Sequence, residues 1–321
     1  MIGNDGAKIS REVLPYLSPA IRKLVGNLEE HQLAGLEELR LRCGQPLFLK
    51  FADQDRTLNS QGKLQADLTR GYQTTLEDVQ RTLASISDNS IYAFEEDIRR
   101  GFITIPGGHR VGLAGQVVSH EGSIKTIKDF SSLCIRIARE VRGAARPLLA
   151  QICPDKANIR NTLIISPPRC GKTTLLRDLA CSLSNGDRGR SGLNVVVVDE
   201  RSELAGSYRG VPQLDVGMRS DVLDSCPKAL GMNIAVRALS PQLVITDELG
   251  RREDGEAVME CINAGVKVIS SIHASNLDEL SKRPLMQELL ACHAFQLGIV
   301  LSRARGPGTV ETLIRWDEGC S

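Results

Sequence analysis

Hydrophobic residues in the first half of the chain follow two different periods. Residues 8–34 and 75–87 place apolar side chains three and four positions apart, which is typical of amphipathic helices. Residues 37–51 and 102–117 instead alternate apolar and polar positions, as the antiparallel strands of hairpins do. These segments predict a small α+β domain built on an antiparallel sheet.

The polar stretches of this half indicate a loop and a boundary. Residues 53–71 are polar and contain glycine, so we expect an exposed loop there. The connector VRGAARP, residues 141–147, is followed by a different hydrophobic pattern. A chain of 321 residues is long enough for two domains, and we place them at residues 1–145 and 146–321.

The second half alternates strands with helices. Helical spacing begins at Lys172 and again at Glu253. Apolar-rich runs predict strands at residues 161–165, 193–198, 243–248 and 266–272, and the four consecutive valines at 195–198 indicate a strand that is buried on both faces. Strands that alternate with helices in this way form parallel sheets. The second half is therefore predicted to be an α/β domain with a parallel-sheet core.

Composition and charge exclude several classes of protein. Lysine and arginine number 40 against 39 acidic residues, so no overall field favours nucleic acid or an anionic membrane. The nine cysteines form no C-x-x-C pair, which argues against a disulfide framework and against a zinc site. No apolar run has the length of a signal peptide or a membrane span. These features predict a cytoplasmic protein.

A candidate phosphate-binding loop joins the first strand of the second half to its first helix, and it ends in Gly-Lys-Thr. Backbone N–H groups of such a loop surround an anion, and the helix N-terminus adds partial positive charge. Lys172 would reach the β- and γ-phosphates of ATP, and the Thr173 hydroxyl would ligate Mg²⁺. The predicted nucleotide-binding residues are Ser166, Pro167, Pro168, Arg169, Cys170, Gly171, Lys172, Thr173 and Thr174.

This loop departs from the usual G-x-x-x-x-G-K-[ST] pattern at its start. Ser166 stands where the first glycine is expected, and Pro167 and Pro168 follow it. Proline has no backbone N–H, so two loop positions cannot donate to a phosphate. We expect this difference to affect the rate of turnover more than nucleotide binding.

Two predicted strands end in paired carboxylates, Asp199-Glu200 and Asp247-Glu248. The second pair suits a metal strand that is separated from the phosphate-loop strand by a further strand. Asp247 would then hold Mg²⁺ through water, and Glu248 would take a proton from the attacking water. Glu200 belongs to a supporting acidic cluster near the γ-phosphate.

Other polar residues join the candidate site less directly. His273 follows a predicted strand, at the same edge as the metal strand, and is a candidate sensor of the γ-phosphate. Arginines crowd the end of the first domain, where one or two could reach the nucleotide of a neighbouring subunit. The sequence does not choose among Arg99, Arg100, Arg110, Arg136, Arg139 and Arg142.

Several stretches, in order, resemble the motifs of the type II/IV secretion ATPases. Beyond the phosphate loop, VVDERSELAG is similar to the acidic box of that family, TDELGRRED to its metal-binding box and VISSIHASN to its histidine box. The stretch YAFEEDIRRGFITIPGGHRVGLAGQVV looks like the first domain of the sporulation members. The resemblance covers roughly residues 35–315.

The resemblance implies a fold and an activity. The fold would be a RecA-like P-loop ATPase domain preceded by a smaller α+β domain. The activity would be Mg²⁺-dependent ATP hydrolysis in a homo-oligomer, a hexamer in this family, which drives a channel complex between mother cell and forespore. The protein would lie at the inner face of the mother-cell membrane without stable DNA binding. The implied catalytic residues are Glu248, His273, Arg251 and Glu200, with Asp199 and Glu203 in the acidic box.

Three other readings of the same residues are considered. A switch GTPase would need an N-K-x-D motif, which the sequence lacks. A nucleic-acid-handling P-loop ATPase has the same core, but the 3% aromatic content offers few platforms on which bases could stack. A scaffold that binds ATP without hydrolysing it is the third reading.

Overall fold

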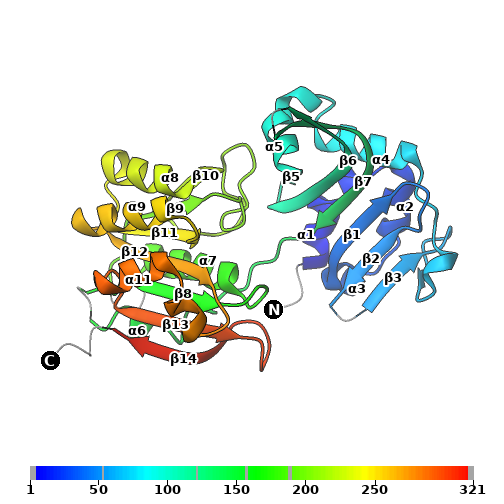
Figure 1. The fold of residues 1–321 in the computed structure, drawn as a ribbon. Coiled ribbons are helices and arrows are strands. Elements are labelled where there is room, and N and C mark those ends of the chain that lie inside the picture. Colours follow the sequence, from blue (N-terminus) through cyan, green and yellow to red (C-terminus); the bar gives the residue numbers. More distant parts are fainter. Residues whose placement is uncertain (1–4, 53, 121, 156–157, 187–189, 317–321) are drawn as a thin grey trace. The chain divides into compact units, whose positions relative to one another are not determined.

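The computed structural model describes residues 5–52, 54–120, 122–155, 158–186 and 190–316. The chain forms two compact units, Met1–Arg139 and Glu140–Ser321 (Figure 1). The first unit ends at Arg139. The sequence pattern predicts the boundary slightly later, at residue 145. No helix of the described residues is long and apolar enough to cross a membrane.

The first unit is α+β. Its helices and short helical turns are α1 (Asp5–Glu12), η1 (Leu14–Tyr16), α2 (Pro19–Gly26), α3 (Glu30–Gly35), η2 (Leu68–Arg70), α4 (Leu76–Ile86), η3 (Ile91–Phe94) and α5 (Glu95–Arg100). Its strands are β1 (Leu36–Arg42), β2 (Phe48–Phe51), β3 (Gln54–Leu58), β4 (Leu64–Gln65), β5 (Phe102–Ile105), β6 (His109–His120) and β7 (Ser123–Arg136).

The strands of this unit form one antiparallel sheet in the order β4-β3-β2-β1-β7-β6-β5. Alternate residues of β1 and β6, such as Leu39, Leu41 and Val111, are buried in a core shared with α2 and α4. This alternation is the strand pattern that the sequence carries. The predicted α+β fold with an antiparallel sheet is confirmed.

The prediction of an exposed loop at residues 53–71 is wrong for residues 54–71, which the structure describes. Instead, β3 pairs with β2 and β4, and it places Thr57 and Leu58 in fully buried positions. The Thr57 hydroxyl donates to the carbonyl of Leu47 at 2.6 Å, which satisfies a polar group inside the sheet. The polar residues of β3 made the segment resemble a loop in the sequence. Its burial comes from pairing with β2 and β4, which the local sequence does not reveal.

The second unit alternates strands and helices. Its helices are α6 (Leu149–Ile152), α7 (Lys172–Asn185), α8 (Lys228–Ile234), the π-helical η4 (Ala235–Leu239), α9 (Arg252–Asn263), α10 (Leu277–Ser281) and α11 (Pro284–Ala291). Its strands are β8 (Thr162–Ser166), β9 (Val195–Asp199), β10 (Ser220–Asp224), β11 (Leu243–Glu248), β12 (Lys267–His273), β13 (Leu297–Ser302) and β14 (Thr309–Arg315).

The sheet of this unit runs β10-β9-β11-β12-β8-β13-β14, and all pairs except β13 with β14 are parallel. Side chains of one strand alternate between two cores. Val195 and Val197 pack with α7 on one face, while Val196 and Val198 pack with α8 and α9 on the other. Burial of both faces explains the uninterrupted apolar runs, and the predicted parallel-sheet core is confirmed.

A buried histidine ties the first helix of the first unit to its sheet. The amide of Ala138 donates to His109 Nδ1 at 3.0 Å, so the ring hydrogen must lie on Nε2, which is 3.1 Å from Glu12 Oε2. A second proton on the ring would go to Nδ1 and would break the hydrogen bond from the Ala138 amide. Burial, with the nearby charge of Lys8, lowers the pKa of His109 from 6.5 to about 4.

We expect this histidine to make the chain sensitive to acid. The unfolded chain takes up the proton below about pH 6.5, whereas folded His109 resists it until about pH 4, so its stabilising effect is lost as the pH falls through this range. The full loss is about 3 kcal/mol. Urea unfolding followed by circular dichroism at several pH values should show this loss in the native chain and less of it in His109→Asn. The control is His31→Asn, at a side chain that is 74% exposed; equal pH dependence in all three proteins would contradict the prediction.

Candidate active site

Strand register brings the predicted site residues to one edge of the parallel sheet. His273, the last residue of β12, lies opposite Ser166, the last residue of β8. On the other side of β12, Glu248 at the end of β11 lies opposite Ser271. The strand that separates the phosphate-loop strand from the metal strand is therefore β12, which comes later in the chain. The carboxyl edge of such a sheet is where α/β proteins bind ligands.

The loop between β8 and α7 has the backbone of an anion-binding turn. Arg169 and Gly171 both take left-handed conformations, with φ of 59° and 89°. Lys172, the first residue of α7, folds back so that its ammonium donates to the carbonyls of Ser166 at 2.9 Å and Pro167 at 3.5 Å. Burial lowers the pKa of Lys172, and the charge of Glu248 opposes this shift.

A hairpin that the sequence pattern did not identify supports this loop from outside. The amide of Gly308, in the turn between β13 and β14, donates to the carbonyl of Cys170 at 2.9 Å. A Cβ atom at Gly171 would lie 3.0 Å from the Gly308 nitrogen. Glycine is therefore needed at position 171 both for its positive φ and for this close approach.

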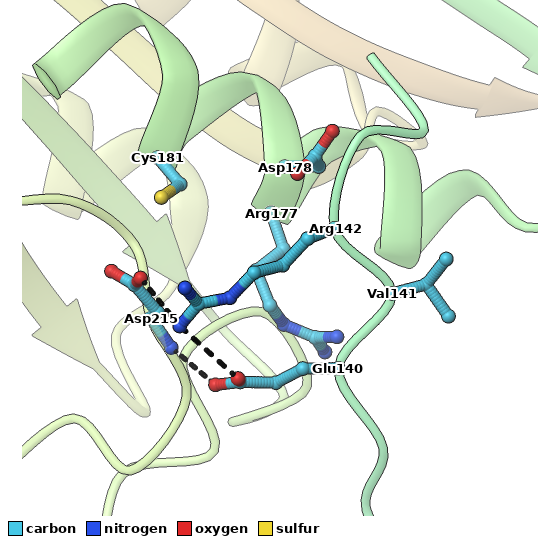
Figure 2. A pocket seen from close by; sticks show the side chains of 7 residues that line it. All are labelled: Glu140, Val141, Arg142, Arg177, Asp178, Cys181 and Asp215. Atoms are coloured by element: carbon cyan, nitrogen blue, oxygen red, sulfur yellow. Dashed lines mark hydrogen bonds and ion pairs between the residues drawn. The ribbon is translucent and has the colours of Figure 1, made fainter. Parts of the chain in front are cut away.

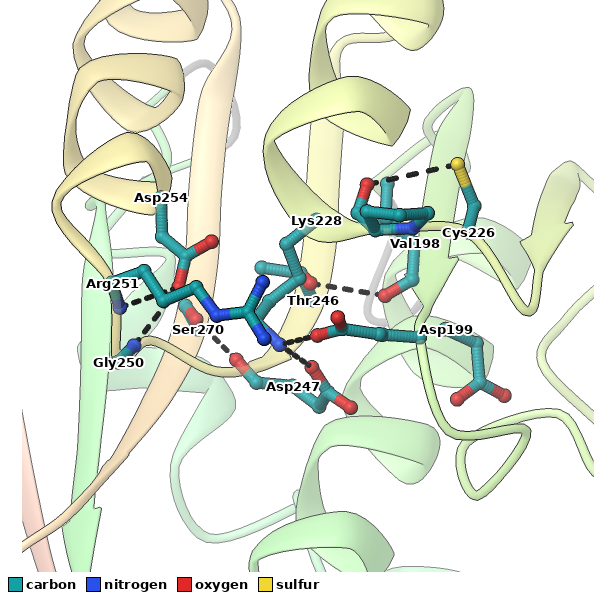
Figure 3. Close-up of polar contacts among 12 residues, drawn as sticks. Val198, Asp199, Cys226, Lys228, Thr246, Asp247, Gly250, Arg251, Asp254 and Ser270 are labelled. Atoms are coloured by element: carbon teal, nitrogen blue, oxygen red, sulfur yellow. Dashed lines mark hydrogen bonds and ion pairs between the residues drawn. The ribbon is translucent and has the colours of Figure 1, made fainter. Parts of the chain in front are cut away.

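Asp247 and Glu200 share a buried lysine, Lys228, which begins α8 (Figure 3). The Lys228 ammonium contacts Glu200 Oε2 and lies 3.1 Å from Asp247 Oδ1. Burial raises the pKa of Asp247, while Lys228 acts to lower it. Burial acts to lower the pKa of Lys228, but the two carboxylates outweigh it and the pKa is raised. The sequence analysis missed Lys228, because only the fold brings α8 against β9 and β11.

The oxygen atoms near the loop suit a magnesium ion. Asp247 Oδ1 is buried and has no hydrogen-bond donor in good geometry, although it faces the Lys228 charge. The Thr173 side chain is half-buried in the first turn of α7. A hydroxyl and a carboxylate are ligands that Mg²⁺ accepts when phosphates and water complete its shell. Within the described ranges no three His, Cys, Asp or Glu side chains are grouped to hold a metal by themselves.

Both carboxylate oxygens of Asp199 accept hydrogen bonds from backbone amides. Its Oδ1 accepts from the amide of Glu203, and its Oδ2 accepts from the amides of Leu204 and Ala205, at 2.9 to 3.0 Å. Burial raises its pKa to about 6, although these donors act in the opposite direction. The guanidinium of Arg177, on α7, donates to the carbonyls of Leu204 and Glu203. Asp199 therefore shapes the acidic loop from inside, and Glu200 is the member of the pair that faces the metal strand.

The remaining predicted residues lie around this edge. Glu248 and His273 are half-buried, which leaves them accessible to a ligand. Arg251 is exposed and precedes α9, and in Figure 3 its side chain extends toward the Asp247–Lys228 pair. Asp254 accepts from the amides of Gly250 and Arg251, which fixes the turn after the metal strand.

The connector that begins the second unit is bound to the helix after the phosphate loop (Figure 2). Asp178 accepts from the amides of Gly143 and Ala145, and Arg142 pairs with Asp215 at 3.0 Å. The amide of Asp215 in turn donates to Glu140. The cavity among these side chains measures about 10 Å³, which is room for a single water at most. This cluster anchors the connector and offers no room for a ligand.

Most of the candidate arginines of the first unit have local partners. Arg99 pairs with Glu95 and Glu96, and Arg110 stacks on Phe102 at 3.5 Å. Arg139 donates to the carbonyls of Ala34 and Leu36. Arg136, exposed at the end of β7, pairs through its backbone with Glu38 and Arg110, and its side chain makes no hydrogen bond or ion pair with any residue that the structure describes.

Comparison with known proteins identifies relatives over most of the chain. The family model described as "Sporulation stage III, protein AA" matches residues 8–319. The Stage III sporulation protein AA of Bacillus subtilis is 42% identical over 302 residues, which is 94% of each chain. The Arabidopsis thaliana protein SEEDLING PLASTID DEVELOPMENT 1 is 25% identical over 282 residues, 86% of this chain and 35% of the plant protein.

Solved structures share the fold at low sequence identity. The ATPase DotB of Yersinia pseudotuberculosis matches with a TM-score of 0.58 and 13% identity, over 95% of this chain and 81% of that one. The pilus retraction motor PilT matches with a TM-score of 0.54 and 13% identity, over 90% and 77% of the two chains. These likenesses confirm the predicted fold, a RecA-like domain preceded by a smaller α+β domain.

The hydrogen bonds of Asp199 predict a structural role that a single substitution can test. In Asp199→Asn one acceptor oxygen becomes an NH₂ group, so at least one backbone amide of the acidic loop loses its partner. A buried donor left unsatisfied costs about 1–3 kcal/mol. Urea denaturation should show a loss of this size, whereas Asp221→Asn, at an exposed position of β10, should be nearly neutral. Unchanged stability in Asp199→Asn would show that the amides do not depend on the carboxylate.

Proposed function

The chain belongs to the sporulation stage III protein AA family, and from that premise we propose that it hydrolyses ATP with Mg²⁺ at the carboxyl edge of its second unit. The observation that carries the proposal is the register of β8, β12 and β11. It sets the loop that ends in Lys172 beside His273, and it sets the acids of β11 one strand away. The shared fold with DotB and PilT supports the same assignment.

The chain's own residues divide the work of this reaction. The loop amides and Lys172 bind the phosphates, and Thr173 and Asp247 would hold the ion. Bound Mg²⁺ would neutralise phosphate charge. Glu248 accepts a proton from the attacking water, because it is half-buried at the end of β11, on the same edge of the sheet as the phosphate loop. His273, beside Ser166, contacts the terminal phosphate, and Glu200 and Arg251 line the same edge.

Hydrolysis would drive a motor. The family name places the chain in sporulation, and a channel or secretion complex between mother cell and forespore is the system that we propose it energises. The chain would act at the inner face of the mother-cell membrane as a ring, with six subunits in the simplest case. The resemblance of its motifs to those of the type II/IV secretion ATPases, whose members form hexamers, supports this assembly.

A ring would allow an arginine of one subunit to reach the nucleotide of the next. Arg136 is the candidate that we select, because it is exposed and its side chain makes no hydrogen bond or ion pair within the described part of the chain. Arg99, Arg139 and Arg142 already have local partners. Each would have to break these contacts to reach a neighbouring subunit. An arginine supplied in trans stabilises the charge of the transferring phosphate.

Nucleotide binding should depend on the loop lysine. Replacing Lys172 with alanine removes the ammonium that would contact two phosphates, so ATP affinity should fall about 10–100-fold. Fluorescence titration with a labelled ATP analogue measures this change. The matched control is Lys267→Ala, at the opposite end of β12. Equal affinity in all three proteins would place the nucleotide elsewhere.

Hydrolysis should depend on Glu248 while binding does not. Glu248→Gln keeps the size of the side chain but cannot accept the proton, so turnover should fall roughly 10²–10⁴-fold with labelled-ATP affinity unchanged. Phosphate release should also rise faster than protein concentration in the native chain if a neighbour completes the site. Equal turnover of native and variant chains would show that Glu248 is not the base. Hydrolysis that DNA stimulates, and that weakens steeply with salt, would favour the nucleic-acid-handling alternative.

A further inference from the structure

Lys228 occupies an unusual position for a cation. Its side chain is only 7% exposed, and it lies at the first residue of α8. The N-terminus of a helix carries partial positive charge, which disfavours a cation there. Burying an ammonium is also costly unless opposite charges surround it closely. Glu200 and Asp247 provide those charges (Figure 3).

The fold holds the ammonium between the two acids. Gly231, one turn along α8, lies so close to β9 that a Cβ atom there would stand 2.5 Å from Val198 Cγ1. This close contact brings the start of α8 down to the strand ends that carry Glu200 and Asp247. A lysine at this place has little freedom to point elsewhere. The pair of acids and the lysine therefore form a built cluster and not a chance surface contact.

Lys228 shares an oxygen atom with the metal that the proposed reaction requires. Its ammonium lies 3.1 Å from the buried Oδ1 of Asp247, the carboxylate that would hold the ion. Without the lysine, two carboxylates would face one small space with a charge of minus two, which attracts divalent cations. With the lysine the charge is minus one, and the cluster is held together without a metal.

We propose that Lys228 is a resident counter-cation, which keeps Mg²⁺ from binding to Asp247 and Glu200 until ATP brings the ion with its phosphates. This role rests on the proposed function and adds a condition to it: the empty site holds its acids in place but does not bind a divalent ion by itself. Lys228 is a positioning residue, because it acts through the acids and not on the nucleotide.

Metal binding to the nucleotide-free chain tests this role directly. Mn²⁺, titrated into the full chain and followed by electron paramagnetic resonance, should bind weakly to the native protein. In Lys228→Met, which keeps the length of the stem and removes the charge, Mn²⁺ should bind about tenfold more tightly or better. Lys228→Arg, which keeps the charge, should behave like the native chain. The double variant Lys228→Met with Asp247→Asn should lose the gained affinity.

The Mn²⁺ affinities of the native chain and Lys228→Met decide whether Lys228 excludes the ion. Equal Mn²⁺ affinity in the native chain and Lys228→Met would overturn the proposal, whether both bind tightly or both weakly. Should Lys228→Met fail to fold, as judged by circular dichroism, Lys228→Gln takes its place. In addition, a non-hydrolysable ATP analogue should tighten Mn²⁺ binding to the native chain, and no tightening would also count against the role. The proposed function is tested separately, since it requires nucleotide binding that Lys172→Ala weakens, whereas the metal titration of the empty chain needs no nucleotide.

Discussion

Parallel pairing of β8, β12, β11 and β9 is the constraint on which the site depends. Because these strands run in one direction, their carboxyl ends meet at one edge of the sheet, and each delivers a different group. The phosphate loop follows β8, His273 ends β12, Asp247 and Glu248 end β11, and Glu200 follows β9. Both faces of each strand are buried, so a shift of register would expose apolar side chains as well as separate these groups.

Charge at this edge is balanced locally. The carboxylate of Asp199 accepts hydrogen bonds from three backbone amides of the acidic loop. Lys228 offsets Glu200 and Asp247, and Arg177 secures the acidic loop through carbonyl oxygens. Glu248 and Lys172, which have opposite charges, are both half-buried at this edge. This division separates residues that shape the site from residues that would touch the nucleotide.

Sequence reasoning succeeds here where local patterns decide the structure. Runs such as Val195–Val198 predict buried parallel strands, and Gly-Lys-Thr after a strand predicts the turn around Gly171. It fails where distant pairing decides, since polar residues 54–58 form β3 because β2 lies beside them. Lys228 could not be identified from its neighbours in the chain, since its partners lie 28 and 19 residues away.

The most direct test of the account is the structure of Glu248→Gln with ATP and Mg²⁺ bound. The account predicts the phosphates in the loop between Ser166 and Thr173, with the ion between Thr173 and Asp247 and the replaced side chain facing the terminal phosphate. Asp247 would then share its charge between the ion and Lys228. A nucleotide bound at another surface, or a loop that still holds Lys172 against the Ser166 carbonyl with no phosphate beside it, would contradict the assignment.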